Sequence, residues 1–332
     1  MRVTGAVQGV GFRPFVYSLA TRLGLAGHVL NDSGGVEIEL EGKNGLVDRF
    51  LGELEASPPP LAVVSSVSAE EMDPAGGDSF EIRTSVRRKE RTVLVSPDYA
   101  TCPDCLRELD DPADRRHGYP FTNCTNCGPR YTIITDIPYD RARTTMSVFE
   151  MCPDCRAEYE DPSNRRFHAE PTCCPACGPK AYLADRTGAP IECRDQIERC
   201  RELLSEGRIV AVKGLGGFHL ACDASNDEAV AELRSRKARE EKPLAVMVRD
   251  MDTAESIVSM TKEEKETLAG KERPILLLTK KEGHGLSELV APKSATFGVM
   301  LPYTPLHHLL MQGTYRALVM TSGNMTDEPI AH

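Results

Sequence analysis

The first 85 or so residues carry short hydrophobic patterns that change period several times. Strands are predicted at 1–7, 28–30, 36–40, 63–67 and 80–82. The clearest is Val-Glu-Ile-Glu-Leu at 36–40, whose strict alternation marks a strand with one buried face. Helices are predicted at 15–23, which Gly24 stops, and at 46–54, whose apolar residues share one face. The order β-α-β-β-α-β predicts a ferredoxin-like fold.

A second pattern of helices and strands fills the C-terminal part of the chain. A helix is predicted at 196–205, followed by a strand at 208–212 and by later hydrophobic strands at 244–247 and near 319–320. The fold class is therefore α+β and multidomain, with domains expected at 1–88, 98–182 and 190–332. The basic run at 87–91 is interpreted as a solvated linker between the first two.

The segment between these patterns is poor in hydrophobic residues and rich in cysteine. Four Cys-x-x-Cys pairs occupy it: Cys102 and Cys105, Cys124 and Cys127, Cys152 and Cys155, Cys174 and Cys177. They are separated by 18, 24 and 18 residues, and a shift of 50 residues lays the first half of the segment over the second. Each half therefore offers the four thiolates of one tetrahedral zinc site.

A disulfide framework is the alternative for such a segment, but it is typical of small secreted domains. The N-terminus has no signal peptide, and no apolar run approaches the length of a membrane span, so we expect a reducing, cytoplasmic compartment and no membrane. Two zinc ions are expected. Four thiolates leave no open coordination position, so both should be structural. The pairs can share a zinc consecutively, or the first with the fourth and the second with the third.

The overall charge argues against a nucleic-acid-binding protein. The 332 residues carry a formal net charge of −10, only 5% of them are aromatic, and there is no tryptophan. A surface that binds a polyanion is usually basic and offers aromatic rings for base stacking. Nucleic acid is therefore an unlikely partner.

The segment from Val7 to Pro14 has the composition of an anion-binding loop. Gly9 and Gly11 allow backbone N–H groups to turn toward one point, and the following helix adds the positive end of its dipole. Arg13 offers a planar fork of donors for a phosphate. A tight turn without a ligand would use the same glycines.

With the later strings Gly27-x-Val29-x-Asn31 and Gly35-Val36-Glu37, this loop resembles the acylphosphatase family. The resemblance implies that Arg13 binds phosphoryl oxygens and that Asn31 orients the attacking water. It implies phosphate-binding positions at Gln8, Gly9, Val10, Gly11 and Phe12. Because the Arg13 side chain is expected to face an anion rather than a core, Arg13→Ala should abolish hydrolysis and leave the fold intact. The family's first strand is longer by several residues, which predicts a clipped N-terminus.

Three polar motifs mark the C-terminal domain as a candidate nucleotide site. They supply cations for phosphates and hydroxyl or amide groups for ribose or a metal ion: Lys213, Gly214, Gly216, Gly217 and His219; Arg236, Lys237, Arg239 and Lys242; Thr321, Ser322 and Asn324. A solvated basic helix with ordinary turns would look similar. In this order the motifs resemble the YrdC/Sua5 family, which implies an adenylate made from ATP.

All three segments together resemble the N-terminal part of the HypF family, the carbamoyltransferases of NiFe-hydrogenase maturation. The segments 119–124 and 300–308 are similar in sequence to the corresponding segments of that family. The resemblance implies hydrolysis of carbamoyl phosphate, formation of a carbamoyl adenylate from ATP with Mg²⁺, and transfer of the carbamoyl group to the C-terminal cysteine of HypE. We expect the family's further domain to be absent and the chain to be a fragment with a truncated YrdC-like domain, in which adenylation is doubtful and transfer fails.

Two other functions compete with this one. A threonylcarbamoyl-adenylate synthase of tRNA modification would share the YrdC-like motifs, but it would not need the acylphosphatase segment. A zinc-dependent RNA-binding protein would share the zinc module, and the acidic charge weighs against it.

Overall fold

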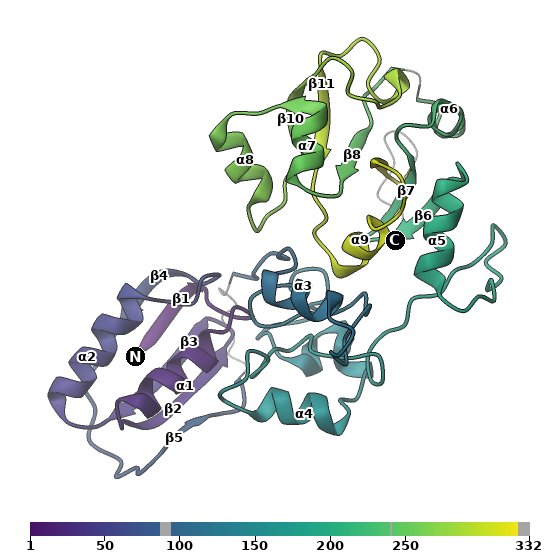
Figure 1. Ribbon diagram of the computed structural model, residues 1–332. Coiled ribbons are helices and arrows are strands. Elements are labelled where there is room, and N and C mark those ends of the chain that lie inside the picture. The colour runs from purple at the N-terminus through teal and green to yellow at the C-terminus, as the bar shows by residue number, and fades with distance from the viewer. Residues whose placement is uncertain (87–93, 240, 325–332) are drawn as a thin grey trace. The chain divides into compact units, whose positions relative to one another are not determined.

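The computed structural model describes residues 1–86, 94–239 and 241–324 (Figure 1). The predicted linker at 87–91 and the C-terminal end of the chain lie outside these residues. The chain divides into two compact units, Met1–Tyr99 with Thr122–Pro179, and Ala100–Phe121 with Lys180–His332. The cysteine-rich segment is thus shared by the two units and does not form a unit of its own.

The first unit contains the five-stranded sheet that the sequence predicts. Its elements are β1 (Arg2–Ala6), α1 (Phe12–Arg22), β2 (Ala26–Asp32), β3 (Gly35–Glu41), α2 (Asn44–Ala56), β4 (Val63–Ser68) and β5 (Phe80–Ile82). The strand order is β4-β1-β3-β2-β5, with β5 parallel to β2 and the other neighbours antiparallel. The first four strands have the order of a ferredoxin-like sheet, and the predicted fold class is confirmed.

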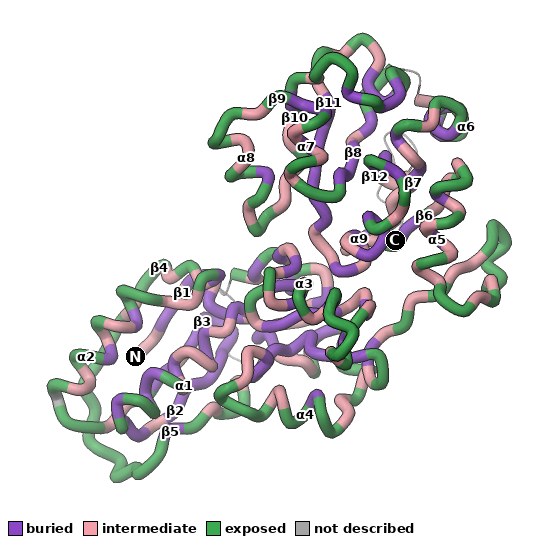
Figure 2. Tube along the Cα trace, viewed as in Figure 1, coloured by how far each residue is buried: buried purple, intermediate pink, exposed green. Residues whose placement is uncertain are grey.

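The core of this unit lies between the sheet and its two helices. Val36 and Ile38 on β3 are fully buried. Glu39, which follows Ile38 and points to the opposite face of the sheet, is exposed, as the alternation of the sequence requires. Phe50 and Leu54 of α2 are also fully buried in the same hydrophobic cluster. Figure 2 shows this burial along β1 to β3.

Helix α1 begins at Phe12, three residues earlier than predicted. The sequence interpretation placed Pro14 before the helix, but a proline is tolerated in the first turn because its missing N–H would have no intrahelical partner there. Arg13 is therefore held on the first turn of a helix. This placement fixes the side chain on an ordered element instead of a loop.

The duplication of the cysteine-rich segment is visible in its helices. Helices α3 (Pro103–Asp110) and α4 (Pro153–Glu160) each have eight residues, follow a cysteine and start with proline. Helix α3 belongs to the second unit and α4 to the first. Between them lie two short 3₁₀ helices, η1 (Arg141–Arg143) and η2 (Thr145–Val148).

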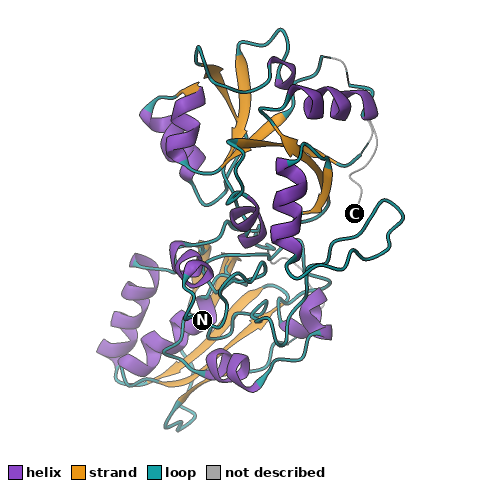
Figure 3. Cartoon of the chain, turned by 45° about the vertical axis from the view of Figure 1, so that its right-hand side comes forward, coloured by secondary structure: helices purple, strands orange, loops and turns teal. Residues whose placement is uncertain are grey.

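The second unit is built on a mixed sheet of seven strands (Figure 3). Its strands are β6 (Val210–Lys213), β7 (Phe218–Asp223), β8 (Ala245–Val248), β9 (Val258–Ser259), β10 (Leu276–Lys280), β11 (Thr296–Met300) and β12 (Ala317–Ser322). Its helices after α3 are α5 (Gln196–Ser205), α6 (Asp227–Arg236), α7 (Met251–Ile257), α8 (Lys262–Ala269), α9 (Pro305–Leu310) and the 3₁₀ helix η3 (Glu288–Val290). The order is β6-β7-β12-β8-β11-β10-β9, and only β8 and β11 are parallel among these pairs. No helix in the described part of the chain is long and apolar enough to cross a membrane.

Candidate functional site

The loop between β1 and α1 owes its shape to two glycines. Gly9 and Gly11 have φ angles of 73° and 75°, in the left-handed region that side chains disfavour. A Cβ atom on Gly9 would lie 3.0 Å from Cε1 of Tyr139, so the tyrosine ring would have to shift to admit one. The predicted need for glycine here is thus both conformational and steric.

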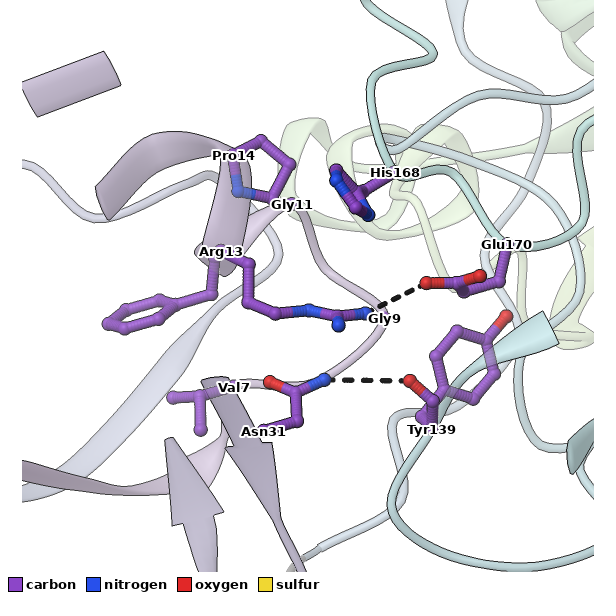
Figure 4. A pocket seen from close by; sticks show the side chains of 10 residues that line it. Val7, Gly9, Gly11, Arg13, Pro14, Asn31, Tyr139, His168 and Glu170 are labelled. Carbon is purple, nitrogen blue, oxygen red and sulfur yellow. Dashed lines mark hydrogen bonds and ion pairs between the residues drawn. The ribbon is translucent and has the colours of Figure 1, made fainter. Parts of the chain in front are cut away.

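A pocket opens at this loop, entirely within the first unit (Figure 4). The loop, α1 and β2 supply one side, and the cysteine-rich segment supplies the other. Its lining residues are Val7, Gly9, Gly11, Phe12, Arg13, Pro14, Asn31, Tyr139, His168 and Glu170. The structure therefore brings the two expected catalytic residues, Arg13 and Asn31, to one cavity.

Arg13 is buried and held by acidic groups. Its side chain is only 8% exposed; Nη2 donates to Oε1 of Glu170 at 2.8 Å, and Nη1 lies 3.1 Å from Oδ1 of Asp140. Nη1 also donates to Oγ of Ser85 at 3.4 Å. Burial alone would lower the pKa of Arg13, but the charges of Glu170 and Asp140 outweigh it and raise the pKa. The guanidinium stays charged, and its remaining N–H groups are available for an anion.

These contacts correct one sequence-based expectation. The Arg13 side chain was expected to face an anion rather than a core, so that an alanine would leave the fold intact. Removing one partner of a buried ion pair leaves the other charge unpaired, which costs about 3–5 kcal/mol. Arg13→Ala would therefore leave Glu170 unpaired and destabilise this unit.

Glu170 is a pocket residue that sequence reasoning missed. Its side chain is 3% exposed, and Oε2 accepts from the backbone N–H of Arg141 at 2.9 Å and from the hydroxyl of Tyr159 at 3.0 Å. Burial raises the pKa of Glu170, against the opposing charge of Arg13. Glu170 corresponds to Pro120 in the first half of the duplication, so the difference between the two halves was the signal that could have revealed it.

His168 also differs from the residue at the same position in the first half of the duplication, which is Gly118. Its counterpart Gly118 has a φ of 63°, and His168 keeps this left-handed conformation with a φ of 50°. A side chain held in that region is strained, and such strain gathers at functional sites. Burial, with a smaller contribution from the charge of Arg13, lowers the pKa of His168 to about 4, so the imidazole that lines the pocket is neutral at pH 7.

Asn31 and Tyr139 line this cavity, and each has a buried polar atom without a partner among the described residues. Asn31 is fully buried, and its Nδ2 donates to the backbone oxygen of Tyr139 at 3.5 Å. Within the described residues, Oδ1 of Asn31 and the hydroxyl of Tyr139 have no hydrogen-bond partner. A buried polar atom without a partner is costly, so both atoms fit a site that is completed by a bound molecule.

Three predicted phosphate-binding residues can take part only through their backbone. Val10 and Phe12 are buried in the hydrophobic core. The side chain of Gln8 donates to the backbone oxygens of Asp32 and Gly35, both at 2.8 Å, and its Oε1 accepts from the N–H of Tyr139. Gln8 thus holds the loop in shape.

The eight paired cysteines gather in two sets of four. Cys102, Cys105, Cys124 and Cys127 form one set, and Cys152, Cys155, Cys174 and Cys177 form the other, each with its sulfur atoms within 4.8 Å of one another. Of the two pairings left open by the sequence, the consecutive one is found. In the second set, neighbouring sulfur atoms lie 3.6–3.8 Å apart, as around one tetrahedral metal ion. Both sets fit zinc.

The three candidate nucleotide-binding motifs meet at one end of the second unit's sheet. His219 at the start of β7 is the register partner of Ser322 at the end of β12. Nζ of Lys237 donates to the backbone oxygens of Ser322 and Asn324 at 2.6 and 2.7 Å, and Nη1 of Arg239 donates to Oγ1 of Thr321 at 3.2 Å. The first and the last motif are separated by about 100 residues in sequence, yet all three form a single cluster.

The glycine-rich turn of this cluster is closed by its own backbone. The N–H of Gly214 donates to the oxygen of Gly217 at 2.8 Å, and Gly216 has a φ of 79°. Nζ of Lys213 lies 5.0 Å from the centre of the Phe218 ring. Among the residues that the structure describes, the side chains of two predicted ones do not contact this cluster. Arg236 is 64% exposed and pairs with Glu232, and Lys242 is exposed.

Two histidines add unpaired polar groups near the turn. The rings of His219 and His307 are stacked, with centres 6.0 Å apart. Nδ1 of His219 and both nitrogens of His307 have no hydrogen-bond partner among the described residues. Burial, followed by the nearby imidazoles of His219 and His308, lowers the pKa of His307 to about 3. His219 had been predicted at this site, and His307 had not.

Models of three protein families match the chain. The acylphosphatase family matches residues 1–82, the HypF finger matches residues 101–134 and 151–184, and the Sua5/YciO/YrdC family, described as telomere recombination, matches residues 202–332. Each finger match holds one of the two sets of four cysteines.

Whole proteins with these segments are also similar to the chain. The carbamoyltransferase HypF2 of Cupriavidus necator is 51% identical over 99% of this chain and 43% of its own length. An acylphosphatase of Thermotoga maritima is 49% identical over 25% of this chain and 92% of its own length. The crystal structure of a full-length HypF in a phosphate- and nucleotide-bound form has a TM-score of 0.95 and 48% identity, covering 99% of this chain and 43% of that one. The chain thus spans less than half the length of the HypF proteins it matches. With its acylphosphatase domain, duplicated finger and Sua5/YrdC-type domain, the chain belongs to the HypF family.

Proposed function

We propose that the pocket at the β1–α1 loop hydrolyses carbamoyl phosphate to inorganic phosphate and carbamate. The observation that carries the proposal is the charged Arg13, which lies in a buried pocket with the unpaired Oδ1 of Asn31. The HypF relatives are named carbamoyltransferases, which supports carbamoyl phosphate as the substrate among possible acyl phosphates.

In this mechanism the chain positions reactants and stabilises charge. Arg13 and the backbone N–H groups of residues 9–13 bind the phosphoryl oxygens. Oδ1 of Asn31 accepts a hydrogen bond from the attacking water and orients it toward phosphorus. The water oxygen forms the new P–O bond while the bond between phosphorus and the carbamate oxygen breaks. An acyl phosphate is already activated, so the reaction needs no nucleophilic side chain.

In the same proposal, the second unit carries out the next step, the formation of an adenylate from the carbamate and ATP. The carbamate attacks the α-phosphorus of ATP and displaces pyrophosphate, giving carbamoyl adenylate. Lys237, Arg239 and the 321–324 loop contact the nucleotide, and Mg²⁺ accompanies its phosphates. In the whole protein the carbamoyl group passes to the C-terminal cysteine of HypE. The clustering of the three motifs at one end of the sheet supports this assignment.

The zinc ions serve the fold. When bound, each zinc supplies a fixed tetrahedral link between the two ends of a finger. In the second finger, Cys152, Cys155, Cys174 and Cys177 hold the metal, and the residues between these pairs reach the pocket. Thiolate ligands of this kind persist in a reducing compartment, and we place the protein in the cytoplasm.

One incubation tests these activities separately. The chain is mixed with carbamoyl phosphate and ATP, and phosphate, AMP and pyrophosphate are measured independently. Phosphate release without ATP supports the first step, and pyrophosphate release that requires carbamoyl phosphate supports the second. Pyrophosphate exchange driven instead by threonine and bicarbonate would identify a threonylcarbamoyl-adenylate synthase. Sub-micromolar RNA binding that weakens with salt would favour the RNA-binding alternative.

A further inference from the structure

A carboxylate is an unexpected neighbour for a phosphate. Glu170 lines the anion pocket and contacts the same guanidinium that is proposed to bind the phosphoryl group (Figure 4). A buried negative charge repels a phosphate dianion and offsets part of the attraction of Arg13. Such a group is useful in the pocket if the substrate brings a hydrogen-bond donor to it.

We propose that Glu170 determines the specificity of this site by accepting a hydrogen bond from the amino group of a carbamoyl phosphate. The inference rests on the proposed hydrolysis and names the substrate group that the pocket selects. It assigns the choice of substrate to the second finger, because Glu170 lies between the cysteine pairs of that finger.

The hydrogen bonds of Glu170 leave one acceptor position for such a donor. A carboxylate oxygen can accept about two hydrogen bonds. In the described structure Oε2 already accepts two, from the backbone N–H of Arg141 and the hydroxyl of Tyr159. Oε1 accepts one, from Nη2 of Arg13. The second position on Oε1 therefore lies beside the guanidinium that holds the phosphate.

The chemistry of the acyl group then decides which substrates fit. The carbon of a carbamoyl phosphate carries an NH₂ group with two donors, and one of these can reach Oε1 while the phosphate contacts Arg13. Acetyl phosphate carries a methyl group at that place. A methyl group would displace water from Oε1 without donating a hydrogen bond to it. A site that hydrogen-bonds a polar substrate group rejects an analogue that lacks this group.

The alternative role for Glu170 is to position Arg13. In that case its loss would impair every acyl phosphate to the same extent, because all of them use the arginine. Asp140 provides the matched control, since its Oδ1 lies 3.1 Å from Nη1 of Arg13 and it does not line the pocket.

The experiment compares two substrates in the wild-type chain and three variants. Hydrolysis of carbamoyl phosphate and of acetyl phosphate is measured for the wild-type chain, Glu170→Gln and Asp140→Asn. Glu170→Ala is the second variant, in case the glutamine amide clashes with the N–H of Arg141. Zinc content and far-ultraviolet circular dichroism establish that each variant is folded.

We expect kcat/KM for carbamoyl phosphate to fall roughly 10- to 100-fold more than for acetyl phosphate when Glu170 is replaced, the value of one hydrogen bond to a charged group. Asp140→Asn should lower kcat/KM for both substrates by the same factor. Equal losses in a folded Glu170 variant would overturn the inference and leave the hydrolase function standing. A wild-type chain that hydrolyses neither substrate would overturn the proposed function itself, and the inference with it.

Discussion

The carboxylate of Glu170 lies 2.8 Å from the guanidinium of Arg13, although 157 positions separate the two residues in sequence. Arg13 belongs to the first turn of α1, and Glu170 belongs to the second zinc finger. The finger thus completes the wall of the pocket that the acylphosphatase loop begins. The proposed hydrolysis therefore requires a segment that lies between the cysteine pairs of this finger.

Loss of the second zinc should therefore impair hydrolysis. Cys155→Ser removes one of its four thiolates, and elemental analysis should then find one zinc per chain instead of two. The segment with His168 and Glu170 would lose its anchor, so phosphate release from carbamoyl phosphate should fall at least roughly tenfold. Cys193→Ser, outside both sets of four cysteines, is the matched control and should keep two zincs and full activity. Full hydrolysis by a one-zinc Cys155→Ser chain would separate the finger from the site.

Asn31→Ala should slow the chemical step more than it weakens binding. Its Oδ1 has no partner among the described residues and is proposed to orient the attacking water. Loss of one positioning group of this kind typically lowers kcat roughly 100-fold. Steady-state kinetics with carbamoyl phosphate should show this loss in kcat with little change in KM. A large rise in KM at normal kcat would assign Asn31 to substrate binding.

The two neighbouring cations at the end of α6 should differ in nucleotide binding. Lys237 donates to the backbone of Ser322 and Asn324, whereas Arg236 is 64% exposed and pairs with Glu232. Lys237→Ala should weaken ATP binding at least roughly tenfold, because the 321–324 loop loses a charged anchor. Arg236→Ala should leave it within about twofold. Titration calorimetry with ATP and Mg²⁺ measures both, and equal losses would show that the helix acts only through its general charge.

Stability should fall in mild acid because of His307. Burial lowers its pKa in the folded chain to about 3, whereas an unfolded histidine titrates near 6.5. Between these pH values the unfolded state binds a proton that the folded state does not, so folding is penalised increasingly as the pH falls from about 6.5 toward 3. Urea unfolding at several pH values should show this slope, and His307→Leu should make it shallower. His117→Gln, at an exposed histidine, should leave the slope unchanged.

The sequence predicts most elements whose ends carry a local signal. Helix α5 runs from Gln196 to Ser205 as expected, because the side chain of Asp195 accepts from the N–H groups of the first turn. Helix α1 was predicted to start late, because Pro14 was interpreted as a boundary and not as a residue of the first turn. Local patterns thus place the elements, and a proline near an end leaves their limits ambiguous.

The residues of the candidate site also differ in whether a local sequence motif predicts them. Arg13 and Asn31 were predicted from motifs close to their own strands, and the structure places both at one pocket. Glu170 could not be predicted from such a motif, since its role arises from a contact made across the whole first unit. The comparison of Gly118 with His168 and of Pro120 with Glu170 in the duplicated halves was the accessible signal.

Phosphate release from carbamoyl phosphate without ATP, measured for the wild-type chain and for Arg13→Lys, tests the hydrolytic site most directly. Lysine keeps a positive charge beside Glu170 but loses the planar fork of donors. We predict hydrolysis by the wild type, a loss of at least roughly 100-fold in Arg13→Lys, and an unchanged rate in Arg22→Lys, whose side chain on the same helix is 58% exposed. Undiminished phosphate release from folded Arg13→Lys would contradict the assignment of this pocket as the hydrolytic site.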